Sequence, residues 1–321
     1  MPQLLTELAR LGHVARVRTL RARGVSERVI RSAIAAGVVA RPRHGWVASG
    51  AADQDQLRGI AVGGRLGCSS ALRRYGVWAG DDLRLHLHVP RTASRLRAEA
   101  EPAWSGNVGV WHPSALERMR GVPPPRLATD DPPRVHWARD RSGHLALDWI
   151  VSPHTALADA LRCMVPEHAS AAIDSVLHER VLTRREVDAV IAALPAPAAG
   201  LIDEFTGRTE SGAESLFVRR LAAHGFHVVT QVPLGGFGRY DGMIDGCVLF
   251  EIDGRGFHSG SGEFFADRDR TLVAQVFGVP VVRPSARHVL GDWPAVLAAV
   301  TRTVEDAQLV RRHRGLPPAI G

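Results

Sequence analysis

The chain has 321 residues, of which 45% are hydrophobic, and its mean hydropathy is −0.04. At roughly 100 to 200 residues per domain, this length corresponds to about two domains, each able to bury a core. The longest apolar runs are far shorter than the roughly 20 residues of a membrane helix. Glu7 interrupts the opening stretch where a signal peptide would stay apolar. We therefore expect neither a membrane protein nor a secreted one.

The basic residues have an unusual composition, because all 40 are arginine and the chain contains no lysine. Residues 1–50 hold nine arginines against two acidic residues, and residues 51–100 hold eight against five. The rest of the chain carries a net charge of −3. A basic end on a near-neutral body favours an anionic partner, most often nucleic acid. The alternative is a compositional bias towards arginine without a binding role.

The three cysteines, Cys68, Cys163 and Cys247, lie far apart, and none belongs to a CxxC pair. This spacing predicts neither a disulfide framework nor a zinc site built from thiolates. It favours a protein of the reducing cytoplasm.

The first 50 residues predict a winged helix-turn-helix. Leucines recur at helical spacing in the first segment, and a second short helix ends at Gly24. Ser26 is placed to cap a third helix, and a turn-rich stretch then separates two short apolar runs. The expected elements are helices at 3–11, 17–22 and 27–36, and a hairpin of 38–40 with 46–48.

Basic side chains fall where such a domain meets nucleic acid. Arg28 and Arg31 lie on the exposed face of the third helix, and Arg41, Arg43 and His44 lie at the tip of the hairpin. In this geometry they could reach phosphates or a groove edge. The alternative is a small helical domain whose arginines are simply solvated.

The run GVSERVIRSAIAAGVVARPRHGWVA resembles the winged-helix domain of the AbiEi antitoxin family, over about residues 3–50. In this chain Trp46-Val47 replaces the usual aliphatic and aromatic pair. The resemblance implies DNA as a partner and raises the prospect of a cognate toxin or defence partner.

The middle of the chain, residues 51–200, predicts an α+β connector. Residues 55–76 look helical, and leucines then alternate with His86 and His88 in a strand at 83–89. The two histidines share one face, and we favour a position on the sheet surface over a metal site. Residues 155–194 predict helices, the last with a capping box of Thr183 and Glu186, and 195–200 predicts a linker.

The last segment, residues 209–310, predicts an α/β sandwich with a mixed sheet, of the restriction-endonuclease-like kind. A leading helix, a three-stranded meander, a crossover helix, a further strand and a final helix follow one another. The expected elements are a helix from Ser211, strands at 228–232, 239–244 and 247–252, a helix at 267–277, a strand at 279–283 and a helix at 294–304.

Asp241, Glu251 and Asp253 make this segment chemically informative. Glu251 and Asp253 are two positions apart and share a strand face. A two-residue turn at Asp245-Gly246 would place Asp241 on the opposite face, whereas a three-residue loop pairing 241 with 249, or a bulge, would bring all three together. We expect convergence, with Asp245 as a turn residue.

Converging carboxylates repel one another unless a cation holds them, and hard oxygen ligands suit Mg²⁺ or Mn²⁺. A metal so held could activate water, which favours phosphodiester hydrolysis. The alternative is that these acids are loop residues beside glycines.

The motifs SGAES, QVPLGGFGRYD, VLFEIDGRGFH, FFADRDR and GVPVVR, over residues 211–303, resemble Vsr-like endonuclease domains of the PD-(D/E)XK superfamily. The resemblance implies metal ligands at Asp241 and Glu251, with Asp253 ending an E-x-D variant of the motif. It also implies an acid on the leading helix at Glu214, and Gln231, His258, Asp267 and Arg270 as neighbours of the site.

One departure is important, because Asp253 stands where the superfamily has a lysine. His258 could act as base and Arg255 or Arg270 as charge stabiliser, or two metals could replace the lysine. We also expect Arg255 and Arg270 to contact the nucleic acid. Structural roles stay open too: Glu214 could complete a capping box with Ser211, and Asp267 could form a helix-surface ion pair.

We therefore predict an α/β multidomain protein that acts as a Mg²⁺- or Mn²⁺-dependent DNA endonuclease, with a role in defence or repair. The alternative is a DNA-binding transcriptional regulator, related to antitoxins, whose nuclease-like domain is inactive. A homodimer is compatible with either function.

Overall fold

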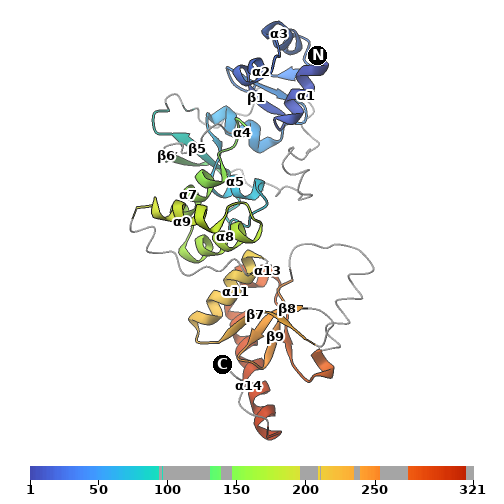
Figure 1. Cartoon of the computed structure of the whole chain (residues 1–321), viewed down its shortest axis with the longest axis vertical. Helices are drawn as coiled ribbons and strands as arrows, with labels where there is room; N and C mark the ends of the chain where they lie inside the picture. Colours follow the sequence, from blue (N-terminus) through green and yellow to red (C-terminus); the bar gives the residue numbers. More distant parts are fainter. Residues whose placement is uncertain are drawn as a thin grey trace. The chain divides into compact units, whose positions relative to one another are not determined.

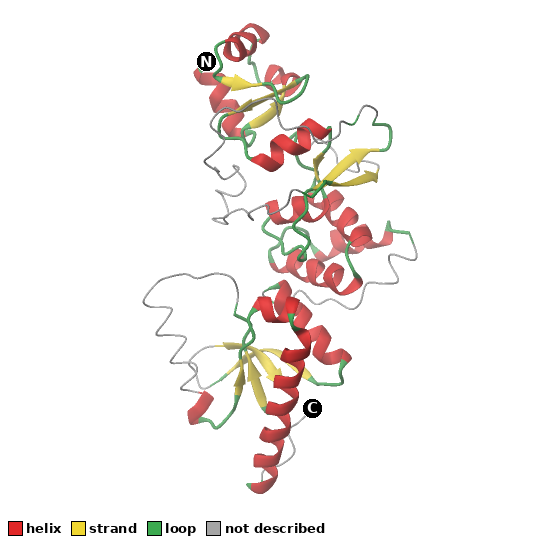
Figure 2. Ribbon diagram, turned by 180° about the vertical axis from the view of Figure 1, so that it is seen from behind, coloured by secondary structure: helices red, strands yellow, loops and turns green. Residues whose placement is uncertain are grey.

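The structure is a computed structural model of the chain. It describes residues 1–93, 96, 131–138, 147–195, 209, 211–234, 239–253 and 274–315. These residues form a mixed α/β protein with helices around three small sheets (Figures 1 and 2). The chain divides into two compact units, residues 1–169 with 179–202, and residues 170–178 with 203–321. Within the described ranges, no helix has both the length and the apolar character needed to cross a membrane.

The N-terminal segment confirms the predicted helices and hairpin and adds one strand. The Ser26 hydroxyl accepts the N–H of Val29, so it caps the third helix as expected. The strand order is β1-β3-β2, antiparallel throughout. The unpredicted strand β1 has only three residues, too few for a visible alternation. The elements are α1 (Pro2–Arg10), β1 (Val14–Arg16), α2 (Val17–Ala22), α3 (Glu27–Ala35), β2 (Val39–Ala40) and β3 (Trp46–Ser49).

This segment packs on the residues that follow it in the first unit. Leu4, Leu8, Leu11 and Leu20 form a buried core with other residues that include Ile30 and Val47. The Trp149 indole N–H donates to the Leu11 carbonyl at 2.9 Å, and the Gln56 amide donates to the Gly12 carbonyl at 2.8 Å. The predicted segment 1–50 therefore lies in the same compact unit as most of the predicted segment 51–200.

The next elements surround a second sheet, of order β4-β5-β6, in which β5 and β6 are parallel. The stretch predicted as helical at 55–76 is interrupted, because Gly63 takes a left-handed backbone (φ 108°) and β4 follows. The elements are α4 (Gln54–Val62), β4 (Arg65–Leu66), α5 (Cys68–Arg74), β5 (His86–Pro90) and β6 (Arg134–Ala138).

The expected surface position of His86 and His88 is wrong. Their side chains are 2% and 0% exposed. His88 Nδ1 lies 2.7 Å from the carboxylate of Asp159, on a helix that covers this face of the sheet. Leucines and histidines alternate along this strand because they face opposite sides of the sheet, but His86 and His88 on one side are as buried as Leu85 and Leu87 on the other.

Three helices complete the described part of this region, as the pattern over 155–194 predicted. The capping box is confirmed, since the Thr183 hydroxyl accepts from Glu186 N–H and the Glu186 carboxylate accepts from Thr183 N–H at 2.8 Å. Of the predicted linker 195–200, only Pro195 is described. The helices are α7 (Pro153–Cys163), α8 (Pro166–His178) and α9 (Arg184–Ala192).

The helix α8 is shared between the compact units, because residues 170–178 belong with the second. Asp174 of this stretch accepts a hydrogen bond from the Ser215 hydroxyl at 2.6 Å and pairs with Arg219 at 2.9 Å. The second unit is therefore assembled from two separate pieces of the chain.

The second unit contains the predicted mixed sheet, of order β10-β9-β8-β7. The first three strands in the chain form an antiparallel meander, and β10 is parallel to β9. Only the end of the predicted helix 267–277 is described, and the final helix is longer than predicted. The elements are α11 (Gly212–Ala223), β7 (Val228–Pro233), β8 (Arg239–Ile244), β9 (Val248–Phe250), β10 (Val281–Val282), α13 (Ala286–Gly291) and α14 (Trp293–His313).

The helix α11 packs on this sheet through aromatic contact, because the rings of Phe217 and Phe250 lie 4.8 Å apart. The Phe250 ring also lies over Gly242 of the neighbouring strand. A Cβ added at Gly242 would meet that ring at 2.5 Å and the Val229 carbonyl oxygen at 2.3 Å. Glycine is therefore required at this point of the sheet.

We expect Gly242→Ala to lower the free energy of unfolding by about 1–3 kcal/mol, because the new methyl group would push on backbone as well as on a packed ring. Chemical denaturation measures the change. Gly291→Ala is the matched control, since no atom lies within 4 Å of its added Cβ. Equal stability of the two variants would contradict the packing described here.

Candidate active site and nucleic-acid interface

The hairpin of β8 and β9 brings Asp241 and Glu251 together. Gly242 pairs with Phe250 and Ile244 with Val248, so Asp241 stands level with Glu251 on the adjacent strand. The Asp241 Oδ2 atom accepts the backbone N–H of Ile252 at 2.7 Å, which orients this carboxylate towards β9. The predicted convergence is confirmed for Asp241 and Glu251, although the predicted pairing of 241 with 249 is wrong.

The turn explains the difference. Asp245 and Gly246 both take left-handed backbone conformations (φ 45° and 60°), and Cys247 N–H donates to the Ile244 carbonyl. The loop is therefore Asp245 to Cys247, one residue later than predicted. The Asp245 carboxylate accepts the N–H of His227 at 2.8 Å, so its expected role in the turn is confirmed.

Gln231 and Glu214 extend the acidic pair on its other side. Gln231 lies level with Asp241, because Thr230 pairs with Gly242 and Val232 with Tyr240. Its backbone is left-handed (φ 61°), an uncommon state for a non-glycine residue. Its amide lies 3.3 Å from the Glu214 carboxylate, which comes from α11 and is 1% exposed. Ser211 accepts the Glu214 N–H, so this residue also belongs to the start of the helix.

Arg283 completes the row at the far edge. The parallel pairing of β9 with β10 places it level with Glu251. Its guanidinium lies 3.1 Å from Glu251 and 3.3 Å from Asp253. Glu251 is 7% exposed, whereas the Asp253 side chain is 56% exposed. Arg283 is the last residue of the motif GVPVVR, but the sequence did not assign it to the site, because it lies 32 positions after Glu251.

The row of Gln231, Asp241, Glu251 and Arg283, with Glu214 beside it, is the candidate active site. Its acidic residues, Asp241, Glu251 and Glu214, are partly or fully buried. Burial raises the free-energy cost of keeping a carboxylate charged without a nearby cation. Their donor atoms are all oxygen, the type that Mg²⁺ and Mn²⁺ prefer. Four other residues singled out in the sequence lie outside the described residues: Arg255, His258, Asp267 and Arg270.

Of the five nucleic-acid contacts predicted in the N-terminal segment, four are exposed. Arg28 and Arg31 lie on the solvent side of α3, and Arg41 and His44 lie between β2 and β3. Arg43 is different, because its guanidinium donates to the Ala61 carbonyl at 2.8 Å and packs against the end of α4.

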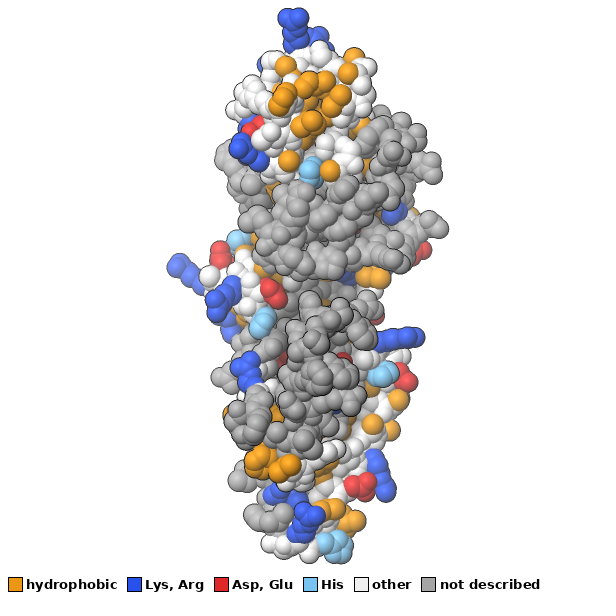
Figure 3. Space-filling model, turned by 90° about the vertical axis from the view of Figure 1, so that its right-hand side faces the viewer, with side chains coloured by type: hydrophobic (Ala, Val, Ile, Leu, Met, Phe, Trp, Pro, Cys, Tyr) orange, Lys and Arg blue, Asp and Glu red, His pale blue; other side chains and the backbone are white. Residues whose placement is uncertain are grey.

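The exposed surface of the N-terminal segment is not uniformly basic. On the face in Figure 3, hydrophobic side chains gather over this segment, and arginines lie around it. Met1, Leu5 and Val38 are among its exposed hydrophobic residues. A nucleic-acid interface would therefore use part of this surface.

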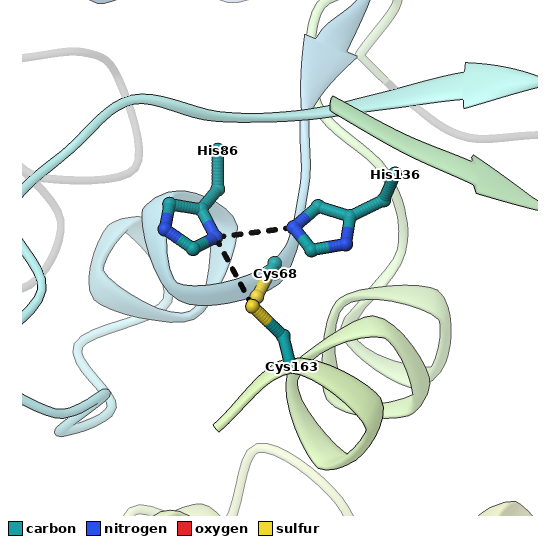
Figure 4. A group of neighbouring side chains, drawn as sticks. All are labelled: Cys68, His86, His136 and Cys163. Atoms are coloured by element: carbon teal, nitrogen blue, oxygen red, sulfur yellow. Dashed lines mark hydrogen bonds between the residues drawn. The ribbon is translucent and has the colours of Figure 1, made fainter. Parts of the chain in front are cut away.

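The sequence did not predict one further group of residues that could hold a metal ion. Cys68, His86, His136 and Cys163 offer ligand atoms that all lie within 4.8 Å of one another (Figure 4). Burial raises the pKa of the Cys68 thiol. The pKa of Cys163 is held far below its ordinary value, chiefly by the hydrogen bond from Cys68. The four residues come from different elements, so no short motif contains them.

Comparison with known proteins gives no relative for this chain: no protein-family model, no curated protein and no solved structure matches it.

If the row binds a divalent cation, Glu251→Gln should lower its affinity for Mn²⁺ at least about tenfold, or ~1.4 kcal/mol, through loss of a charged ligand. Arg283→Met should raise the affinity, because the carboxylates lose their resident cation. Calorimetric titration measures both. Asp245→Asn is the control and should bind as the wild type does. An unchanged affinity in Glu251→Gln would remove this residue from the site.

Proposed function

We propose that the protein binds DNA through an N-terminal winged helix-turn-helix and hydrolyses phosphodiester bonds with a C-terminal restriction-endonuclease-like domain. One observation carries the catalytic half of the proposal: Asp241 and Glu251 lie level on adjacent strands, with the buried Glu214 and the half-buried Gln231 beside them. A leading helix followed by an antiparallel meander and a parallel edge strand supports the fold.

The DNA-binding half rests on topology and charge. The order helix, strand, helix, helix, strand, strand, with the first strand beside the last, is typical of a winged helix. The third helix is the one that enters the major groove in such domains, and it carries the exposed Arg28 and Arg31. Arg41 and His44 at the hairpin tip would contact the backbone of the duplex.

In this proposal Asp241 and Glu251 hold the metal ion, with Asp253 or Glu214 beside them. A divalent cation bound there would lower the pKa of a coordinated water and polarise the phosphate. Arg283 supplies the fixed positive charge that a lysine supplies elsewhere in the superfamily. A guanidinium stays protonated, so Arg283 would steady the charge developing on phosphate and would not take a proton.

The same arginine favours a second candidate function. Its guanidinium already neutralises Glu251 and Asp253 without any metal. A site whose carboxylates are already paired with an arginine would suit a DNA-binding regulator whose nuclease-like domain binds no metal and serves only for interaction.

A cleavage assay separates the two functions. With Mg²⁺ or Mn²⁺ and plasmid, linear or single-stranded DNA or RNA as substrate, we expect cleavage by the wild type. Asp241→Asn and Glu251→Gln should each lower its rate roughly 100-fold or more. Asp245→Asn, a turn residue on the same hairpin, should keep the wild-type rate.

Cleavage that survives in both active-site variants would point to a contaminating nuclease and remove the site. Absence of cleavage on every substrate, in a folded protein that still binds DNA, would favour the regulator.

DNA binding is tested through its dependence on salt. Replacing Arg28, Arg31 and Arg41 by alanine should weaken binding and reduce the slope of log K against log salt by about 0.9 for each phosphate that is no longer neutralised. Fluorescence anisotropy at several salt concentrations measures the slope. Arg184→Ala with Arg185→Ala, on the exposed face of α9, is the control and should leave the slope unchanged. An unchanged slope in the triple variant would contradict the interface.

A further inference from the structure

Four side chains of the first unit converge on one point, far in the chain from Asp241 and Glu251. Cys68 begins α5, His86 begins β5, His136 lies in β6 and Cys163 ends α7. Figure 4 shows both imidazole rings and both sulfur atoms turned inward from these four elements. The cluster exists only in the folded chain, because its members are widely separated in the sequence.

Two measured separations between these atoms are close to those expected for a tetrahedral zinc site. His86 Nδ1 lies 3.1 Å from His136 Nε2 and 3.8 Å from Cys163 Sγ. With zinc bond lengths of about 2.0–2.1 Å to nitrogen and 2.3 Å to sulfur, a tetrahedral site places two nitrogens about 3.3 Å apart and a nitrogen about 3.6 Å from a sulfur. These two separations are thus already close to ligand spacing, and all four ligand atoms lie within 4.8 Å of one another.

The orientation of His86 is set by a carboxylate behind it. Its outer nitrogen, Nε2, lies 3.3 Å from Asp82 Oδ2. Asp82 is itself held by the Arg84 guanidinium at 2.6 Å. A ring that donates its Nε2 proton to Asp82 presents the lone pair of Nδ1 to the cluster. Metal-binding histidines are commonly oriented by such a carboxylate.

The backbone around Cys68 is shaped to bring the thiol to this point. A Cβ at the preceding Gly67 would meet the His88 backbone nitrogen at 2.9 Å, so only glycine lets α5 begin so close to β5. Cys68 itself has a left-handed backbone (φ 46°), a state that costs energy for a non-glycine residue. Strained backbone of this kind is enriched at functional sites.

We propose that Cys68, His86, His136 and Cys163 form a tetrahedral zinc site. Thiolate and imidazole ligands select zinc over magnesium or manganese, so this site is distinct from the oxygen-lined row of the second unit. Two thiolates balance the charge of the ion, and this suits a pocket in which Cys68 and His86 are buried. Four protein ligands fill the coordination sphere and leave no position for a reacting water, which makes the site structural.

Such a site would fix the edge of the second sheet. The strand β6 lies at that edge and pairs only with β5 within the described sheet. It reaches the helices α5 and α7 through His136. Bound zinc would therefore join an edge strand to two helices that the chain connects through long intervening segments.

The test is the metal content of the full-length wild-type protein, purified under reducing conditions without chelator. We expect inductively coupled plasma mass spectrometry to find one zinc ion per chain. After removal of zinc, Co²⁺ should give the strong visible absorption of a tetrahedral site and a thiolate-to-cobalt charge-transfer band. Co²⁺ bound by the carboxylate row would give no charge-transfer band, because that band requires a sulfur ligand. Zinc, but not Mg²⁺, should restore the melting temperature of the chelator-treated protein.

The variants Cys163→Ala and His136→Ala should both lose the bound zinc. In the presence of Co²⁺, each should also lose the charge-transfer band or the visible absorption of a tetrahedral site. Both residues are only partly buried, and circular dichroism checks that the variants fold. Cys247→Ala, the third cysteine, is the matched control and should keep one zinc ion. The proposal would be overturned if the wild-type protein contained no zinc and gave no tetrahedral cobalt spectrum. It would also be overturned by an unchanged spectrum in Cys163→Ala, or by recovery of a Cys68–Cys163 disulfide in place of metal.

Discussion

A buried carboxylate needs a cation, and the only fixed cation in the side chains of this protein is the guanidinium group of arginine. The described residues meet this requirement repeatedly. Arg74, itself 3% exposed, pairs with Asp53 and Asp55 and holds the start of α4 against α5. In the second unit, Arg283 plays the same part for Glu251. Because breaking a buried pair leaves an uncompensated charge, each arginine constrains both the fold and the chemistry around it.

The sequence predicted local structure well where one short pattern decides it. Ser26 and Thr183 begin helices because their hydroxyls satisfy free N–H groups of the first turn, a property of three or four consecutive residues. The convergence of Asp241 with Glu251 was also predictable, because strand alternation allows only two answers. The exact pairing was not, since it depends on Asp245 and Gly246 sharing the left-handed conformation.

The parts of the candidate sites that the sequence did not predict depend on contacts between elements that are distant in the chain. Arg283 joins the candidate site only because β10 lies parallel to β9, and parallel strands carry no local sign of their register. The Cys/His cluster is a stronger case, because its four members come from four elements and span residues 68 to 163. The burial of His86 and His88 likewise depends on α7 covering the sheet, which alternation along one strand does not report.

The division of α8 between the compact units limits how this protein can be cut or recombined. The chain enters the second unit at residue 170, leaves it after 178 and returns at 203. A fragment that starts at 203 would carry the carboxylate row but would lack Asp174, the partner of Ser215 and Arg219 on α11. The boundary that looks natural in the sequence, near residue 200, is therefore a poor place to separate the two halves, and exchange of the C-terminal unit between proteins would have to bring the α8 segment with it.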